Sequence, residues 1–290
     1  MPSLMSNKLN LYLRLTRMDR PIGWLLLLWP TLWGLWIAGE GSPSPMIVVV
    51  FVAGVILMRA AGCIVNDYLD KDFDRHVTRT KNRPLATGEI SEREAGALFL
   101  LLIGMAFGLA LTLNRLTLML AAVGLLLTLT YPLFKRFTYV PQLYLGVVFS
   151  WGMPMAFAAQ KNYVPFICWA LLLANLLWTV AYDTMYAMAD RPDDKLVGIK
   201  STAILVGQYD LLFNVTCQAA SLIVLMFIGQ ELELGPWFYS GLLVAAGMAI
   251  YQNRLCKDRN RHLCFKAFLN NAWFGGVIFL GIVMAYLATS

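Results

Sequence analysis

Aspartates gather in two short stretches of the sequence, and the first reads NDYLDKDFD. In it, Asp67, Asp70 and Asp74 follow one another at intervals of three and four residues. If a helix continues through this stretch, the three carboxylates share one face with Asn66 and Asp72 points elsewhere, because residues three, four and seven positions apart lie on the same side of a helix. At the C-terminal end of a helix, where the helix dipole is negative, such a cluster needs a cation to compensate its charge.

The second stretch, YDTMYAMADRPDD, supplies Asp183, Asp190, Asp193 and Asp194. Asp190 and Asp194 stand four residues apart, with Pro192 between them. Proline lacks the N–H that a helix interior uses but is tolerated in the first turn, so Pro192 predicts a loop or a helix start here. This stretch again places several negative charges at the end of an apolar run with few counterions nearby.

Two interpretations fit these clusters. In the first, the carboxylates are hydrated loop charges, partly neutralised by neighbouring arginines and lysines. In the second, they form a divalent-cation site, because Mg²⁺ prefers oxygen ligands and usually takes one or two protein carboxylates, with water and substrate phosphate as its remaining ligands. Basic residues near both clusters match a phosphate-bearing anion bridged by Mg²⁺, an anion that carboxylates alone would repel. Two such clusters on one side of a bundle favour the metal site.

The elements that must position these clusters are those of a membrane protein. Of the 290 residues, 59% are hydrophobic and 14% are charged, whereas a soluble domain carries about 25% charged residues. Apolar runs of about 18 residues or more recur along the chain and are typical of transmembrane helices. This composition excludes a water-soluble globule. The five cysteines form no CxxC pair and there are two histidines, so neither a disulfide framework nor a zinc site is indicated.

We therefore predict an all-α fold, a polytopic membrane bundle of about nine transmembrane helices, which forms a single domain over residues 1–290. An amphipathic helix at 7–20 is expected to precede the spans and to lie in the membrane interface, because it mixes basic and apolar residues. Segments 64–93 and 183–209 are expected to be cytoplasmic Asp-rich loops. The expected spans are 21–38, 46–65, 95–113, 116–134, 143–159, 164–183, 211–229, 237–252 and 267–287.

The distribution of basic residues predicts the orientation of this bundle. Lysines and arginines gather in the N-terminal segment and in every second loop, and only Arg59, Arg115 and Lys161 fall elsewhere. By the positive-inside rule, the N-terminus is cytoplasmic. Both acidic stretches then face the cytoplasm. A diphosphate held there, at the mouth of an apolar bundle, suggests a lipid-tailed diphosphate whose tail lies among the spans.

These features resemble the intramembrane UbiA-type aromatic prenyltransferase superfamily, and the resemblance runs from about residue 11 to the last span. The motif NDxxDxxxD of that superfamily is matched at Asn66, Asp67, Asp70 and Asp74, and its motif DxxxD at Asp190 and Asp194. The runs DRPIGWLLLLWPTLWGLW, MRAAGCIVNDYLDKDFDRHVTRTKNRPL and AYDTMYAMADRPDDKLVGIKSTA are similar to one branch, the bacterial 4-hydroxybenzoate polyprenyltransferases of ubiquinone biosynthesis.

The resemblance implies an activity, a cofactor and roles for residues. The expected reaction is Mg²⁺-dependent transfer of a polyprenyl group from polyprenyl diphosphate to 4-hydroxybenzoate, ortho to its hydroxyl, in a bacterial inner (cytoplasmic) membrane with the active site facing the cytoplasm and no nucleic-acid partner. Arg136 is expected to bind the acceptor's carboxylate. The expected metal ligands are Asp67, Asp70, Asp74, Asp190 and Asp194, of which all but Asp67 are also expected to be catalytic. The expected diphosphate-binding residues are Asn66, Asp67, Arg79, Arg83 and Lys200.

Several alternatives stay open from the sequence. Arg136 also fits an ordinary positive-inside anchor. Arg59, inside a span and two turns before Asn66, reaches either a carboxylate or the substrate, or else forms a structural ion pair. The superfamily motifs also fit another acceptor, such as a naphthoate, a haem or a tocopherol-type ring. A cation-coupled transporter is disfavoured, because coupling carboxylates normally lie near the membrane midplane and these lie at the ends of spans.

Overall fold

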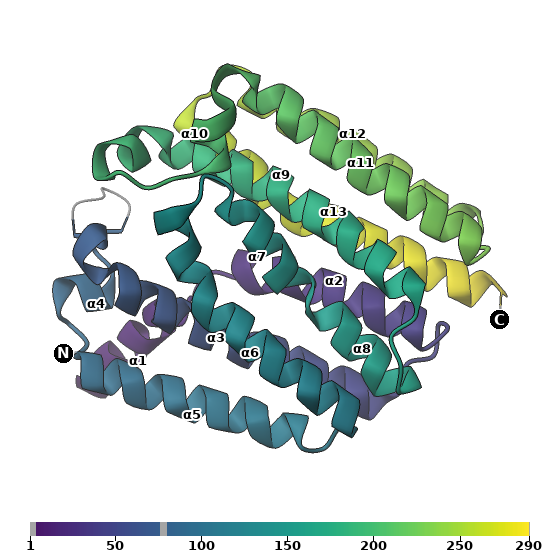
Figure 1. Ribbon diagram of the computed structural model, residues 1–290, viewed down its shortest axis with the longest axis horizontal. Coiled ribbons are helices and arrows are strands. Elements are labelled where there is room, and N and C mark those ends of the chain that lie inside the picture. The colour runs from purple at the N-terminus through teal and green to yellow at the C-terminus, as the bar shows by residue number, and fades with distance from the viewer. Residues whose placement is uncertain (1–3, 76–79, 290) are drawn as a thin grey trace.

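The computed structural model describes residues 4–75 and 80–289, and within these ranges all regular secondary structure is helical (Figure 1). This confirms the predicted all-α fold. The long helices form one bundle, with the N-terminus at one end of the view and the C-terminus at the other. The helices are α1 (Leu4–Leu15), α2 (Ile22–Ala38), α3 (Pro45–Asp74), α4 (Pro84–Thr87), α5 (Glu92–Ala110), α6 (Arg115–Phe137), α7 (Pro141–Ser150), α8 (Gly152–Lys161), α9 (Phe166–Val197), α10 (Thr202–Val206), the short 3₁₀ helix η1 (Gly207–Tyr209), α11 (Asp210–Glu231), α12 (Pro236–Cys256) and α13 (Arg261–Thr289).

Local sequence explains where several of these helices begin and end. Ser91 precedes α5, and its side chain accepts a hydrogen bond from the backbone N–H of Glu94 at 3.2 Å. Asn114 caps α6 in the same way, accepting from the N–H of Thr117 at 2.9 Å. Such caps satisfy backbone donors that have no partner inside the helix. At the other end of α9, Gly198 adopts φ +73°, a conformation that glycine reaches without the steric cost of a side chain.

Seven segments are long and apolar enough to cross a membrane, among the residues that the structure describes. They are Pro45–Asp72, Glu92–Ala110, Arg115–Phe134, Pro141–Lys161, Phe166–Leu196, Thr202–Glu231 and Arg261–Thr289. Two more of the expected spans also coincide with helices: α2, which is apolar but has only 17 residues, and α12, which is not among the seven. The chain is thus a polytopic helical membrane protein.

Both acidic stretches lie on helical extensions of spans, so the expected Asp-rich loops are largely helical. The first stretch closes α3 and the second continues α9 as far as Val197. The expectation that Pro192 marks a loop or a helix start is wrong, because Pro192 lies inside α9. A proline removes only one backbone donor from the ladder, here the one that would reach the carbonyl of Met188, and the helix continues on both sides of it.

A stack of aromatic rings joins α2, α9 and α13 in the centre of the bundle. The ring centroids of Trp33 and Trp178 are 5.4 Å apart, and those of Trp178 and Phe274 are 5.2 Å apart. Both indole N–H groups are satisfied, since Trp33 donates to the carbonyl of Gly275 and Trp178 donates to Asn271. Buried rings whose polar atoms are paired stabilise a fixed arrangement. This core holds α9, and with it the second acidic motif, in place.

Candidate active site

One cavity of about 710 Å³ receives side chains from both acidic stretches. Its walls come from α2, α3, α5, α6, α7, α8, α9 and the first part of α13. The carboxylates that line it are Asp67, Asp70 and Asp74 from α3, and Asp183, Asp190 and Asp194 from α9. Two motifs more than a hundred residues apart in sequence therefore open into the same space, as a shared binding site requires.

The first cluster lies on one face of α3, as its spacing predicts. Asp67, Asp70 and Asp74 are only 1%, 3% and 6% exposed, and Asn66 lines the cavity beside them. Asp72 lies on another face, where its side chain is 74% exposed. Buried carboxylates are costly unless they are compensated. The structure therefore confirms the shared face, and these carboxylates need cations as partners.

Two arginines contact Asp67 in the first cluster, and one of them also contacts Asp74. Arg83 bridges two carboxylates, with Nη1 at 3.0 Å from Oδ1 of Asp67 and at 2.7 Å from Oδ2 of Asp74. Arg17 donates from Nη2 to both oxygens of Asp67, at 2.8 and 2.7 Å. These charge-assisted hydrogen bonds are of the strong kind. Both guanidinium groups also line the cavity, where they can bind an anion.

Arg17 is the site residue that the sequence did not single out. It follows α1 in a turn and adopts φ +57°, a left-handed conformation that is uncommon for residues other than glycine and that clusters at functional sites. The sequence offered two indirect signals: a basic residue at the end of an amphipathic helix, and the need for a cation at the acidic end of α3. Neither signal indicates which of several basic residues meets Asp67.

The other predicted cations have different surroundings. Lys200 lines the cavity, and its Nζ lies 3.3 Å from the carbonyl oxygen of Phe137. Arg136 donates to the carbonyl of Leu69 at 2.6 Å and lies 3.9 Å from Oδ1 of Asp70, but it is not among the described residues that line the cavity. Arg79 falls outside the described residues.

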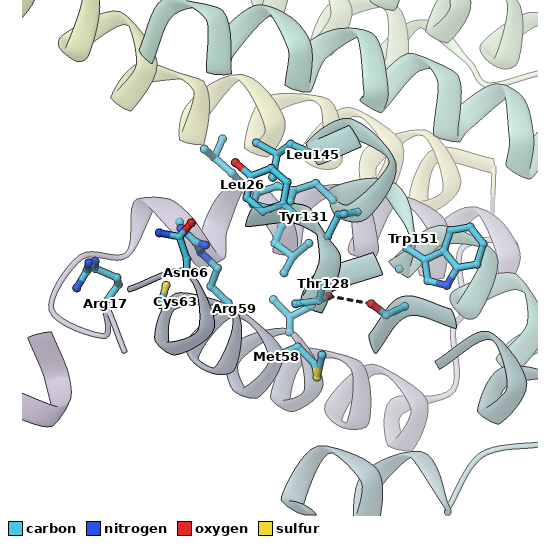
Figure 2. A pocket seen from close by; sticks show the side chains of 18 of the residues that line it. Arg17, Leu26, Met58, Arg59, Cys63, Asn66, Thr128, Tyr131, Leu145 and Trp151 are labelled. Carbon is cyan, nitrogen blue, oxygen red and sulfur yellow. Dashed lines mark hydrogen bonds between the residues drawn. The ribbon is translucent and has the colours of Figure 1, made fainter. Parts of the chain in front are cut away.

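Arg59 lies deeper in the cavity than the arginines at its mouth. Figure 2 shows it beside Asn66, on the same helix and toward the apolar end. Its guanidinium lies over the ring of Phe149, 5.8 Å from the centroid, and against Gly23. A Cβ atom at Gly23 would lie 2.7 Å from two nitrogens of this guanidinium, so glycine makes the close approach possible. Within the part of the chain that is described, Nε of Arg59 has no hydrogen-bond partner.

The remainder of the cavity is apolar and aromatic. Tyr131, Tyr182 and Tyr186 line it next to the acidic end. At the opposite end, Trp151 donates from its indole nitrogen to the carbonyl of Leu120 at 2.8 Å, and Figure 2 shows it far from the arginines. The cavity is thus charged at one end and apolar along its length. Such a space matches a ligand with an ionic head and a long hydrocarbon tail.

The donor set at the charged end fits a hard cation. Burial raises the pKa of the Asp74 carboxyl, and the neighbouring Arg83 guanidinium opposes that shift. Among the described residues, no three acidic, histidine or cysteine side chains already converge closely enough to hold a metal ion together. Mg²⁺ does not need such a cage, because it usually takes one or two protein carboxylates and completes its shell with water and phosphate. The carboxylates of both clusters, facing one cavity with cations beside them, meet that requirement.

Comparison with known proteins identifies the family to which the sequence is similar. The sequence profile of the UbiA prenyltransferase family matches residues 27–288. The chain is similar to the 4-hydroxybenzoate octaprenyltransferase of Aeromonas salmonicida, at 52% identity over 95% of this chain and 96% of that protein. It is similar also to the 4-hydroxybenzoate octaprenyltransferase of Escherichia fergusonii, at 53% identity over 98% of each chain.

Solved structures share the arrangement of helices. The apo structure of a UbiA homologue from Aeropyrum pernix matches with a TM-score of 0.79 and 26% sequence identity, over 90% of this chain and 97% of that one. A UbiA homologue from Archaeoglobus fulgidus bound to GPP and Mg²⁺ matches with a TM-score of 0.70 and 20% identity, over 94% of this chain and 99% of that one. The second match shows a common fold.

Proposed function

The chain belongs to the UbiA prenyltransferase family, and because its cavity is charged at one end and apolar along its length, we infer that it is a 4-hydroxybenzoate octaprenyltransferase of ubiquinone biosynthesis. It transfers the octaprenyl group from octaprenyl diphosphate to 4-hydroxybenzoate. The observation that carries this function is the single cavity that receives both acidic motifs at one end and is apolar along the rest of its length. Relatives at 52% and 53% identity, both named for this activity, support the choice of acceptor.

We propose that the two acidic motifs bind Mg²⁺ together with the diphosphate. The proposed ligands are Asp67, Asp70, Asp74, Asp190 and Asp194, which all line the cavity. A homologue of the same fold is bound to GPP and Mg²⁺, which supports this cofactor. When bound, Mg²⁺ neutralises charge on the leaving diphosphate. Arg17 and Arg83 both contact Asp67 and line the cavity, so they lie beside the proposed metal ligands and would donate to the phosphate oxygens.

The chain's own residues then have separate tasks. Arg17, Arg83 and Lys200 donate to the diphosphate and hold it at the cavity mouth, as does Arg79 in our proposal. Asn66 is proposed to bind the same group.

The apolar walls hold the prenyl tail and keep water from the allylic cation that forms when the C–O bond breaks. Cavity-lining tyrosines offer aromatic faces to that cation. The ring carbon ortho to the phenol attacks it, and loss of a ring proton restores aromaticity.

The acceptor's carboxylate needs a cation, and we propose two arginines for it. Arg59 faces the cavity at the boundary between its charged and apolar parts, and its Nε atom has no hydrogen-bond partner in the described structure. Arg136 is the second candidate, because the resemblance to the family suggests it and it lies 3.9 Å from Asp70. Since Arg136 already donates to the carbonyl of Leu69, we expect Arg59 to contribute more.

Replacing Arg59 by alanine is expected to raise the KM for 4-hydroxybenzoate by about tenfold or more, because a hydrogen bond to a charged group contributes roughly 1.5–3 kcal/mol. The KM for octaprenyl diphosphate should change little. Gly23→Ala should shift the same parameter in the same direction, because its Cβ displaces the guanidinium. Steady-state kinetics with each substrate varied in turn measures both values. A larger effect of Arg136→Ala on the acceptor's KM would assign the carboxylate to Arg136.

We further propose the membrane arrangement. With α2 and α12 added to the seven apolar segments, the chain crosses a bacterial inner membrane nine times. An odd number of spans agrees with termini at opposite ends of the bundle (Figure 1). Following the positive-inside rule, the N-terminus and the active site face the cytoplasm, and the amphipathic N-terminal helix lies in the interface. The whole chain acts as one transmembrane domain.

The acceptor assignment can be tested with purified enzyme in liposomes. Octaprenyl diphosphate and Mg²⁺ are supplied with 4-hydroxybenzoate, with 1,4-dihydroxy-2-naphthoate or with haem, and the products are identified by mass spectrometry. We expect a product that combines the octaprenyl group with 4-hydroxybenzoate, substituted at the carbon ortho to the hydroxyl. Transfer to the naphthoate or haem, without transfer to 4-hydroxybenzoate, would replace the proposed acceptor and leave the prenyl-transfer mechanism intact.

A further inference from the structure

A buried ion cluster lies behind the second acidic motif, away from the cavity. Its centre is Asp210, the first residue of α11, whose side chain is 0% exposed. Arg191, on α9, donates to one of its carboxylate oxygens. Arg259, in the connection between α12 and α13, donates from Nε and Nη2 to the two oxygens, each at 3.0 Å. The cluster therefore joins α9, α11 and the α12–α13 connection.

A second set of contacts lies on the other side of α9, near its C-terminal end. Arg261, the first residue of α13, donates from Nη2 to the carboxylate of Asp193. Its Nε also donates to the backbone carbonyl of Ala189 at 2.8 Å. Arg261 therefore contacts both a side chain and the backbone of α9. Together with the Asp210 cluster, it ties the end of α9 to the α12–α13 connection on two sides.

In this turn of α9, some residues line the cavity and the others make the contacts described above. Asp190 and Asp194 line the cavity, whereas Arg191 and Asp193 are not among its described lining residues. Successive residues of a helix differ by about 100° in direction, so the two acids of the motif share a face and the residues between them point to its flanks. The contacts with Arg259 and Arg261 therefore act on the motif's helix without entering the site.

The end of α9 needs such support for an electrostatic reason. It carries Asp190, Asp193 and Asp194 within five residues, at the helix end where the dipole is negative and where carboxylates are unfavourable. Arg259 also adopts φ +53° and donates to the backbone carbonyl of Gln208 at 2.9 Å. A left-handed conformation at a residue other than glycine persists when the surrounding contacts determine it. Arg259 is thus held in one position.

We propose that Arg259 and Arg261 are positioning residues for the second acidic motif and set the placement of Asp190 and Asp194 for Mg²⁺ and diphosphate. Arg261 contacts α9 directly, whereas Arg259 acts on α9 through Asp210 and Arg191. This inference rests on the proposed function and adds to it residues that touch neither substrate. Groups that orient metal ligands from outside the coordination shell govern metal affinity strongly. The α12–α13 connection then contributes to diphosphate binding through α9, although none of its described residues lines the cavity.

The test compares Arg259→Gln and Arg261→Gln with the matched control Lys257→Gln, which removes one positive charge from the same exposed connection. For the first two variants, we expect the KM for octaprenyl diphosphate and the Mg²⁺ concentration for half-maximal rate to rise by about tenfold. The KM for 4-hydroxybenzoate should stay within about twofold of wild type. The control should match wild type, and Arg259→Lys and Arg261→Lys should recover part of the loss because they keep the charge.

A second measurement does not depend on turnover. Mg²⁺ with inorganic diphosphate should raise the thermal unfolding temperature of the detergent-solubilised wild type, and the two glutamine variants should need about tenfold more Mg²⁺ for half of that shift. The same melting curves show whether a variant is folded, and the lysine variants replace any glutamine variant that is not. The inference is overturned if folded variants match wild type in both measurements, or if both substrates' KM values rise equally. Wild-type protein that shows the Mg²⁺ shift but transfers no prenyl group would instead contradict the proposed function.

Discussion

Asp70→Asn and Asp190→Asn should each reduce prenyl transfer by about 100-fold or more, because a preorganised charged group at a reacting centre is typically worth that much. Both carboxylates are buried in the wall of the same cavity, from different helices. Asparagine keeps the shape of the side chain but removes the negative charge that binds a cation. Transfer of radiolabelled octaprenyl diphosphate in membranes, normalised to the amount of enzyme, measures the effect.

The matched control for these variants is Asp72→Asn. It makes the same chemical change on the same helix, but its side chain is 74% exposed and lies off the cavity face. Its activity should stay within about twofold of wild type. Asparagine keeps the volume of the side chain, so all three variants should be produced at similar levels, and their melting curves identify any variant that is not folded. Activity of Asp70→Asn or Asp190→Asn close to that of Asp72→Asn would defeat the assignment of the motifs.

Removal of Mg²⁺ is the second change with a large expected effect. Treatment of the membranes with a chelator should lower transfer by about 100-fold or more, since neutralising the leaving group contributes several kcal/mol. Added Mg²⁺ should restore the rate. The control is the same chelator saturated with Mg²⁺ beforehand, which should have no effect. The acidic clusters predict this result, because without a cation they repel the diphosphate.

Persistent turnover in excess chelator would contradict the metal-dependent mechanism. In that case the cavity arginines would have to neutralise the diphosphate alone. Arg83→Gln then distinguishes the two mechanisms. If Mg²⁺ carries most of the charge neutralisation, the activity lost in this variant is partly recovered at higher Mg²⁺, whereas an arginine-only mechanism gives a loss that Mg²⁺ does not change.

Local patterns in the sequence predict much of the fold and the shared face of the first acidic cluster. Runs of about 18 apolar residues predict spanning helices because the bilayer's thickness sets their length. The intervals between Asp67, Asp70 and Asp74 predict a shared face because the helix repeat is constant. The resemblance at the two motifs identified the family. Each of these inferences needs only the geometry of one helix or the order of residues along the chain.

The contacts between residues of different helices became known from the three-dimensional structure. Arg17 pairs with Asp67, fifty residues away in sequence, and Arg259 pairs with Asp210 across two helices. Pro192 proved to be helical, and Arg59 proved to face the cavity. The physical reason is that lipid and protein core are both apolar, so hydrophobic periodicity does not mark the inward face of a span as it does in a soluble helix. Contacts between spans therefore depend on how the side chains pack, and that information is not local to any stretch of sequence.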